Sequence, residues 1–135
     1  MKRILIYGSF GLLVEVAWTG TRSMLAGDAA LTATTYLWML PIYGVTALLL
    51  ERVHERIRSW SNWMRGCVWA MLILSFEYGY GYLLRGALGV CPWDYTGAPF
   101  AVDGLIRLDY APAWFLLGLL FEHLHDRLRV RVKQT

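Results

Sequence analysis

The sequence predicts an all-α membrane protein with four transmembrane helices, arranged as two tandem helix–loop–helix repeats. Three observations predict this fold: the composition, four apolar segments and the duplication of one segment. Hydrophobic residues make up 57% of the chain and charged residues 17%, whereas soluble domains are about 45–50% apolar and about 25% charged. A bilayer accommodates this excess of apolar side chains, which the interior of a 135-residue soluble domain cannot bury.

One segment occurs twice in the chain, and this duplication predicts the order of the helices. Residues 41–58 and 112–129 lie 71 positions apart and are identical at seven of 18 positions. Glu15 and Glu77 mark a weaker match 62 positions apart, and the nine additional residues fall in the second loop. We therefore predict a single transmembrane domain over residues 1–135, with repeat one at 1–58, repeat two at 64–129 and a basic tail at 126–135.

Each predicted helix is an apolar segment close to the roughly 20 residues that a membrane span needs. In chain order, the four segments are Ile4–Thr21, Thr32–Leu50, Gly66–Leu84 and Gly104–Phe121. The first and third each contain one charged residue, and the second contains none. The fourth segment carries two charges near its start and has the shortest apolar stretch. Its assignment as a membrane span is supported by the second segment, which is its counterpart in the duplication.

The distribution of basic residues predicts the orientation. Ten Lys and Arg residues lie in the N-terminus, the middle loop and the tail, and three lie in the other two loops. Because positive charge marks the cytoplasmic side, we predict a multi-pass protein of the cell membrane with both termini in the cytoplasm. The partner of the basic surface is then anionic lipid headgroups rather than nucleic acid. A cleaved signal peptide over residues 1–30 is the alternative for the first segment, but Glu15 and the duplication argue against it.

Four charged residues form a candidate polar site within the membrane: Glu15, Glu77, Arg107 and Asp109. The two glutamates fall near the midplane, on helix faces that also carry small residues and are expected to meet. A carboxylate at that depth costs at least about 2.5 kcal/mol, so it needs a partner or a wet cavity. The repeat predicts that the two carboxylates approach each other and share a proton or hold a cation such as Arg107. The alternative is a structural role, in which each pairs with Arg or Trp.

A second candidate site lies at the cytoplasmic mouth, where Glu51-x-x-His54 matches Glu122-x-x-His125. Together with the two midplane carboxylates, these residues reproduce the ligand count of a di-iron carboxylate bundle. The midplane carboxylates are deeper by roughly 10 Å, however, which is too far for metal–ligand bonds of about 2 Å. We therefore predict no metal centre and no cofactor, and we favour paired Glu–Arg helix ends over a two-Glu, two-His site.

The outer loop over residues 88–103 contains Cys91, Trp93, Asp94 and Tyr95. Its prolines and glycine exclude a regular helix, and its aromatic residues suit the headgroup region. We predict an interfacial lid; in the functional alternative, Asp94 lies over the midplane carboxylates and gates them. Cys67 is predicted at the opposite membrane face from Cys91, so no intrachain disulfide is expected.

Several motifs together carry a family resemblance: Leu37-Trp-Met-Leu-Pro-Ile-Tyr-Gly44, Glu51-Arg52, Phe76-Glu77, Cys91-Pro-Trp-Asp-Tyr95, Gly104-Leu-Ile, and Tyr110 through Trp114 to Glu122. On these motifs, which cover most of the chain, it resembles the membrane family described as putative ABC-transporter type IV, itself similar to the eukaryotic transmembrane protein 229 group. The resemblance implies a small polytopic membrane protein. Because the chain has no G-x-x-x-x-G-K-[ST] motif, any ATPase would be a separate subunit.

We therefore expect a transport-related membrane component with a polar intramembrane site for a proton, an ion or a lipid headgroup. The first alternative is an intramembrane lipid-modifying enzyme, in which Asp94, Glu77 and Arg107 supply acid–base and phosphate-binding groups. The second is a non-catalytic membrane scaffold. The sequence contains neither G-x-S-x-G nor H-E-x-x-H, which favours a non-enzymatic role. Four short helices enclose little volume, so a homo-oligomer such as a dimer is expected.

Overall fold

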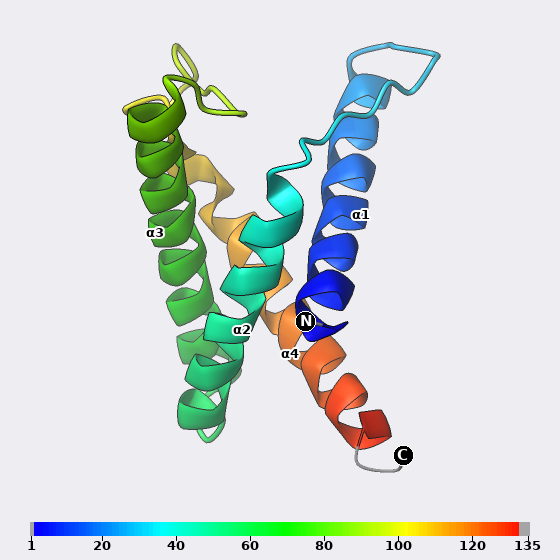
Figure 1. The fold of residues 1–135 in the computed structure, drawn as a ribbon, viewed down its shortest axis with the longest axis vertical. Coiled ribbons are helices and arrows are strands. Elements are labelled where there is room, and N and C mark those ends of the chain that lie inside the picture. Colours follow the sequence, from blue (N-terminus) through cyan, green and yellow to red (C-terminus); the bar gives the residue numbers. More distant parts are fainter. Residues whose placement is uncertain (1, 133–135) are drawn as a thin grey trace. The chain divides into compact units, whose positions relative to one another are not determined.

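A computed structural model describes the backbone of residues 2–132 and the side chains of residues 2–127. The elements in order are α1 (Lys2–Leu25), α2 (Met39–Ile57), α3 (Asn62–Leu88), β1 (Ala101–Val102), β2 (Ile106–Arg107), the 3-10 turn η1 (Leu108–Tyr110) and α4 (Ala111–Val132) (Figure 1). The chain forms two compact units, unit 1 (Met1–Arg52) and unit 2 (Val53–Thr135), so α2 begins in one and ends in the other. Beyond Arg127, the side chains of the predicted basic tail lie outside the described residues.

In unit 1, α1 and the first part of α2 run in opposite directions and pack through glycine (Figure 1). A methyl group at Gly8 would lie 2.4 Å from the carbonyl oxygen of Leu40, and one at Gly44 would lie 2.5 Å from Cγ2 of Ile4. Atoms cannot approach so closely without a shift, so both positions require glycine. The small-residue faces predicted for the first two segments therefore meet within unit 1.

The second helix begins later than the sequence predicts. The apolar segment Thr32–Leu50 predicts a helix from its first residue, whereas α2 begins at Met39. Threonine is a poor helix former, and the backbone of residues 32–34 bonds instead to side chains of α1. Ser23 Oγ donates to the carbonyl oxygen of Thr32 at 2.5 Å, and Thr19 Oγ1 donates to that of Thr34 at 3.0 Å. The first part of the predicted segment is thus an irregular link held along the end of α1.

The ends of α3 are set by two local signals. Ser61 caps the first turn, its Oγ accepting the amide N–H of Met64 at 3.4 Å. Gly89 ends the helix with φ 73°, a left-handed conformation that favours glycine, and its N–H donates to the carbonyl oxygen of Arg85. The long apolar stretch between these caps is therefore one uninterrupted helix.

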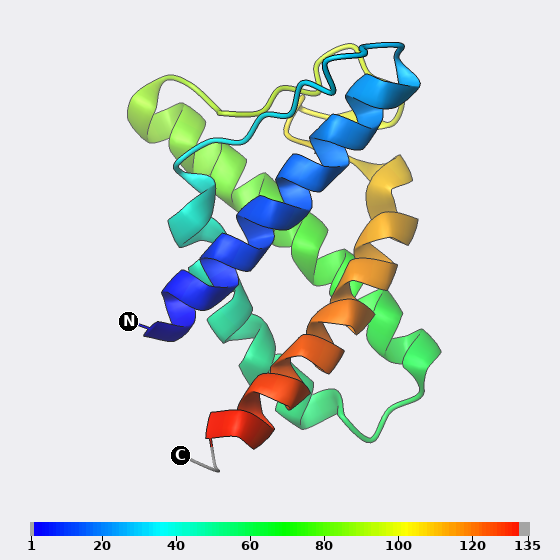
Figure 2. The same ribbon diagram turned by 90° about the vertical axis from the view of Figure 1, so that its right-hand side faces the viewer.

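In unit 2, α4 runs in the opposite direction to α3 and crosses it (Figures 1 and 2). Two glycines admit large side chains at this crossing. A methyl group at Gly66 would lie 2.2 Å from the ring of Phe115, and one at Gly118 would lie 2.1 Å from Cβ of Trp69. Trp69 is 0% exposed. The glycine faces of the third and fourth segments therefore meet around a buried tryptophan.

The fourth helix also begins later than predicted. The segment Gly104–Phe121 predicts a helix, but its first residues form β2, which pairs antiparallel with β1, and then η1. Gly104 has φ +67°, which is typical of a turn rather than of a helix. Helix α4 then begins at Ala111, and Pro112 lies in its first turn, where the missing N–H costs no helical hydrogen bond.

Two of the described helices, α1 and α3, are long and apolar enough to cross a membrane. They contain the predicted first and third spans, which confirms the all-helical fold and two apolar segments of spanning length. Many of their apolar side chains face outward; Leu13 on α1 and Met71 on α3 are each 67% exposed. Lipid-facing side chains have this distribution, whereas a soluble protein of this size would bury them. The spanning of α2 and α4 stays a prediction.

Candidate functional site

Glu15, in the middle of α1, is held by two hydroxyl groups of unit 1. Thr35 Oγ1 donates to Glu15 Oε2 at 2.6 Å, and Tyr43 Oη donates to the same oxygen at 3.2 Å. Among the described residues, Glu15 makes no ion pair. The carboxylate thus lies, half-buried, in a site made of neutral hydrogen-bond donors.

Two features of unit 1 bring these hydroxyl groups to Glu15. The link of residues 32–34 is tied to Thr19, whose Oγ1 also accepts the amide N–H of Thr34 at 3.1 Å, and this tie places the neighbouring Thr35. Gly11 lets Tyr43 approach α1, since a methyl group at Gly11 would lie 2.4 Å from the Tyr43 ring. The irregular link, which interrupts the predicted helix, therefore builds the site.

Glu77, in α3, is bound by the outer loop of unit 2. Tyr95 Oη donates to Glu77 Oε1 at 3.0 Å. The loop is anchored on both sides of this contact: the amide N–H of Tyr95 donates to the carbonyl oxygen of Gly104 at 2.9 Å, and Trp93 Nε1 donates to that of Leu105 at 2.9 Å. Leu105 is almost fully buried. The Trp-Asp-Tyr motif therefore fastens the loop to α3 and places a tyrosine on the carboxylate of Glu77.

The other two outer-loop candidates, Asp94 and Cys91, support the loop itself. Asp94 Oδ1 accepts the amide N–H of Thr96 at 2.9 Å. Hydrogen bonds from Thr96, first from its side chain and then from its backbone, hold the pKa of Asp94 below its usual value. Burial raises the pKa of the Cys91 thiol, so the thiol is the favoured form. Asp94 acts as a turn residue in this structure.

Arg107 and Asp109, predicted to belong to the intramembrane cluster, bind each other. Arg107 donates from Nη2 to Asp109 Oδ2 at 2.6 Å and from Nε to Asp109 Oδ1 at 3.1 Å. The guanidinium carbon of Arg107 lies 4.5 Å from the centre of the Tyr110 ring, a cation–π distance. The structure thus forms a local ion pair before α4. The approach of Glu15 to Glu77 stays a prediction, because the two belong to different units.

At the predicted cytoplasmic mouth, Glu51 of unit 1 is bound by two residues of α1. Arg3 Nη2 donates to Glu51 Oε1, forming an ion pair, and Tyr7 Oη donates to the same oxygen at 2.5 Å. Glu51 is buried. The carboxylate therefore ties the start of α1 to the later part of α2.

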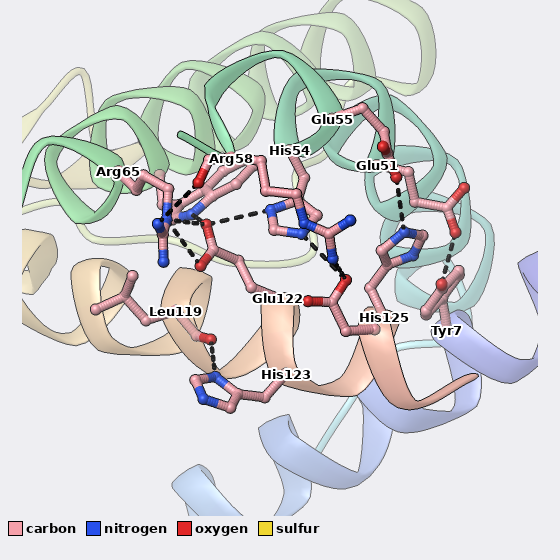
Figure 3. Close-up of polar contacts among 12 residues, drawn as sticks. Tyr7, Glu51, His54, Glu55, Arg58, Arg65, Leu119, Glu122, His123 and His125 are labelled. Carbon is pink, nitrogen blue, oxygen red and sulfur yellow. Dashed lines mark hydrogen bonds and ion pairs between the residues drawn. The ribbon is translucent and has the colours of Figure 1, made fainter. Parts of the chain in front are cut away.

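Glu122 of unit 2 is bound in the same manner by two residues of α3, of which Figure 3 labels Arg65. Arg65 Nε donates to Glu122 Oε1 at 3.0 Å and to Oε2 at 3.1 Å, and Trp69 Nε1 donates to Oε1 at 2.8 Å. Glu122 is 3% exposed. A further donor of Arg65 bonds to the carbonyl oxygen of Trp60 at 2.8 Å, which fixes the loop before α3.

His54 and His125 lie beside this carboxylate in unit 2. His54 Nδ1 is 3.3 Å from Glu122 Oε1, and its Nε2 is 3.3 Å from Asp126 Oδ1. The two imidazole rings lie edge to face with their centres 5.6 Å apart. Asp126 also pairs with Arg58. Burial of Asp126 opposes its ionisation, but the hydrogen bonds from Arg58 and His54 outweigh it and lower its pKa.

The residues of unit 2 at the predicted mouth form ion pairs and hydrogen bonds with one another. In the part of the chain that the structure describes, no group of three or more His, Cys, Asp or Glu residues is arranged to hold a metal ion. Both predicted glutamates, Glu51 and Glu122, pair with an arginine.

Sequence reasoning missed the partners of these two glutamates: Arg3, Tyr7, Arg65 and Trp69. The duplication contains a signal that identifies them. Arg3 and Arg65 lie 62 positions apart, as do Tyr7 and Trp69, and both pairs bind glutamates that lie 71 positions apart. A third match is a packing contact, Ile4 against Gly44 in unit 1 and Gly66 against Phe115 in unit 2. Extending the comparison to the helix starts would have predicted these contacts.

A comparison with protein families decides the classification. The model of the family described as putative ABC-transporter type IV matches residues 3–134, nearly the whole chain. The chain belongs to this family. No solved structure matches it.

Membership of the ABC-transporter type IV family and the two apolar helices together identify a membrane protein. The family description indicates an ABC-transporter-related role. Within this family member, the motif Cys91–Tyr95 has a structural explanation, because its aromatic residues fasten the outer loop to α3 and bind Glu77.

Proposed function

We propose that this ABC-transporter type IV protein is a transport-related component of the cell membrane. In this proposal it crosses the bilayer four times, as two tandem helix–loop–helix repeats with both termini in the cytoplasm. The midplane carboxylates Glu15 and Glu77 form a polar site for a proton or another cation. A homo-oligomer, and a separate ATPase subunit where transport is driven by ATP, are the partners that this role implies.

The environment of Glu15 carries the proposal. Thr35 and Tyr43 donate hydrogen bonds to the carboxylate, but neither supplies positive charge. An ionised carboxylate in a membrane helix is costly without a compensating charge. A proton on the carboxyl group, or a cation bound to it, removes this cost. A structural glutamate, by contrast, is expected to pair with arginine, as Glu51 and Glu122 do at the helix ends.

Three pairs of equivalent contacts support the repeat architecture. The Arg–Glu ion pair, the aromatic donor to the same glutamate and the glycine packing contact all occur in both units at the offsets of the duplication. The irregular links before α2 and before α4 support four crossings, although each of these helices covers only part of its predicted apolar segment. Their backbone polar groups bond to protein, such as the Thr32 carbonyl to Ser23 and the Gly104 carbonyl to Tyr95. Non-helical backbone is tolerated in a bilayer only where it is satisfied in this way.

The topology is testable with single cysteines. In a variant with Cys67 and Cys91 replaced by serine, we expect a cysteine at Gly97 to react with a membrane-impermeant maleimide added to intact cells. Cysteines at Ser59 and at Gln134 are expected to react only after permeabilisation. Labelling of Ser59 from outside would exclude the proposed orientation.

Substitution of the midplane carboxylates tests the transport role. We expect the purified protein in proteoliposomes to conduct protons or monovalent cations under an imposed membrane potential, as measured with a trapped pH-sensitive or cation-sensitive dye. Glu15→Gln and Glu77→Gln keep the shape of the side chain and remove its charge, so each is expected to lower the flux at least about tenfold, the effect of about 1.4 kcal/mol. Tyr43→Phe is expected to lower it less, because Thr35 still donates.

Two controls make this result specific. Asp28→Asn removes a carboxylate of the first outer loop, whose partners are local amide groups, and is expected to leave the flux unchanged. Thermal unfolding of each variant must match the parent, since a Glu15→Gln protein that fails to fold would indicate a structural glutamate. Full flux in both glutamine variants would refute the site. Altered lipid headgroups in a deletion strain, with no flux, would favour the enzymatic alternative.

A further inference from the structure

The indole N–H of Trp114, on α4, has no hydrogen-bond partner among the described residues, although the nitrogen is buried. A buried donor without an acceptor is costly, and most such groups in folded proteins are bonded. The Trp114 ring packs edge to face on Tyr110 with ring centres 6.1 Å apart, and Tyr110 packs in the same way on Tyr95 at 5.9 Å. Tyr95 in turn donates to Glu77. The unbonded N–H therefore belongs to the same cluster of side chains as the Glu77 carboxylate.

The duplication assigns an acceptor to this N–H. Trp114 is the counterpart of Tyr43, which lies 71 positions earlier, and Glu77 is the counterpart of Glu15, which lies 62 positions earlier. In unit 1, Tyr43 Oη donates to Glu15 Oε2 at 3.2 Å. The equivalent contact in unit 2 is a hydrogen bond from the Trp114 indole to the Glu77 carboxylate.

The register of α3 and α4 supports this assignment. Trp69 Nε1 on α3 donates to Glu122 Oε1 on α4 at 2.8 Å. Because the two helices run in opposite directions, a step of eight residues along both leads from this bond to Glu77 on α3 and to Trp114 on α4. In unit 1 the same step leads from one tyrosine–glutamate hydrogen bond to the other, and both bonds are present. Trp114 and Glu77 therefore occupy the equivalent places of the second helix pair.

One residue opposes the equivalent contact in unit 2. In unit 1, Tyr43 packs on Gly11, where an added methyl group would lie 2.4 Å from the ring. The counterpart of Gly11 on α3 is Ile73, 62 positions later. An aromatic ring cannot take the place of the Tyr43 ring there without displacing this branched side chain.

We propose that Trp114 is a further residue of the Glu77 site, a reserve donor whose indole N–H replaces Tyr95 on the carboxylate when the outer loop releases it. The ring contacts couple the two donors, because Tyr95 packs on Tyr110 and Tyr110 packs on Trp114. Release of Tyr95 thus frees the indole ring to turn, and Glu77 keeps a hydrogen bond while the loop is away. Ile73 opposes this second arrangement, so the loop-held arrangement prevails. The use of the exchange in transport rests on the proposed function.

The indole N–H resonance of Trp114 tests the proposal in the full chain in nanodiscs. With 15N-labelled tryptophan, the spectrum of Trp114→Phe assigns this resonance among those of the seven tryptophans. In Tyr95→Phe, which removes the hydroxyl donor of the loop, we expect the resonance to move downfield, because the N–H gains a carboxylate acceptor. Addition of Glu77→Gln removes the charge of that acceptor and is expected to reduce the shift. A Trp114 resonance that stays in place in Tyr95→Phe would overturn the proposal.

Ile73→Gly provides a second route to the same hydrogen bond and does not depend on the folding of Tyr95→Phe. The substitution gives α3 the residue that α1 has at the equivalent position, so we expect the Trp114 resonance to move downfield in this variant as well. Ser75→Gly is the matched control for a glycine in this part of α3, because Ser75 is exposed and donates to the carbonyl oxygen of Met71. An equal shift in Ser75→Gly would contradict the proposal, since it would report a loosened helix.

Tyr78→Phe is the matched control for the outer loop. Tyr78 Oη donates to Asp103 Oδ2 at 2.9 Å, which is another hydrogen bond between α3 and the loop. Its loss is expected to leave the Trp114 resonance in place, because this bond does not involve Glu77. A shift as large as that of Tyr95→Phe would contradict the proposed exchange of donors.

These spectra separate the reserve donor from the transport role, because they require no flux. A downfield Trp114 resonance in Tyr95→Phe, with no cation flux through the parent protein, would support the reserve donor and exclude the proposed function. An unchanged resonance, with a flux that falls in Glu77→Gln, would overturn the reserve donor and leave the proposed function in place.

Discussion

Replacing Gly118 by leucine is expected to abolish the packing of α3 against α4. A methyl group at this position would already lie 2.1 Å from Cβ and 2.3 Å from Cγ of Trp69, and these atoms sit next to the backbone, where they cannot swing away. Trp69 is fully buried, so it has no free space to enter. Overpacking usually costs about 1–3 kcal/mol, and a branched side chain here exceeds that range. We expect Gly118→Leu to yield no monodisperse protein in detergent size-exclusion chromatography.

Gly86→Leu on α3 is the matched control. Gly86 is helical and has no neighbouring atom within 4 Å of the position of a methyl group. Glycine is less favourable than alanine in a helix by about 0.8–1.0 kcal/mol and leucine ranks close to alanine, so this variant is expected to be as stable as the parent or slightly more stable. If Gly118→Leu unfolded at the same temperature as Gly86→Leu, the α3–α4 contact described here would be wrong.

Glu122→Ala is expected to give the second large loss of stability. The substitution removes the acceptor of Arg65 Nε and of Trp69 Nε1 and leaves their donors in a buried place. Removal of one partner of a buried ion pair costs about 3–5 kcal/mol, because the remaining charge is uncompensated. We therefore expect the unfolding midpoint, followed by tryptophan fluorescence in nanodiscs, to fall by about 10 °C or more.

Two further variants separate hydrogen bonding from charge at this position. Glu122→Gln keeps an acceptor oxygen for Trp69 but removes the negative charge, so its midpoint is expected to lie between those of Glu122→Ala and the parent. His123→Ala changes the exposed neighbour and should have little effect. A midpoint of Glu122→Ala equal to that of the parent would show that Arg65 and Trp69 find other partners.

Much of the helical architecture could be predicted from the sequence, because membrane helices leave a strong signal in composition. The apolar segments around Glu15 and Glu77 lie within α1 and α3, where apolar residues and capping signals agree. The starts of α2 and α4 could not be predicted from hydropathy. Thr32 and Thr34 are neutral residues in an apolar segment, but their backbone is held by Ser23 and Thr19, and this tertiary contact decides their conformation.

The sequence could predict which residues belong to the candidate sites, but it could not predict which residues they contact. Charge within an apolar segment identified Glu15, and the duplication identified Glu122. Hydropathy could not identify Thr35, whose hydroxyl group reaches Glu15 only because the irregular link returns along α1. Arg107 was predicted to meet the two glutamates because of its expected depth in the membrane. It binds Asp109 instead, which is close to it in the sequence.

At one packing contact the large side chain and the glycine lie on opposite helices in the two units. This difference affects how four similar helices find their correct neighbours. In unit 1 the large residue, Ile4, is on the first helix and the glycine, Gly44, is on the second; in unit 2 the glycine, Gly66, is on the first and the large residue, Phe115, is on the second. A mistaken pairing of α1 with α4 would bring two large side chains together, and one of α3 with α2 would leave a void between two glycines. Both errors cost packing energy that the correct pairs retain. The two helix pairs are thus distinguishable from each other during assembly, because the large residue and the glycine of this contact lie on opposite helices in the two units.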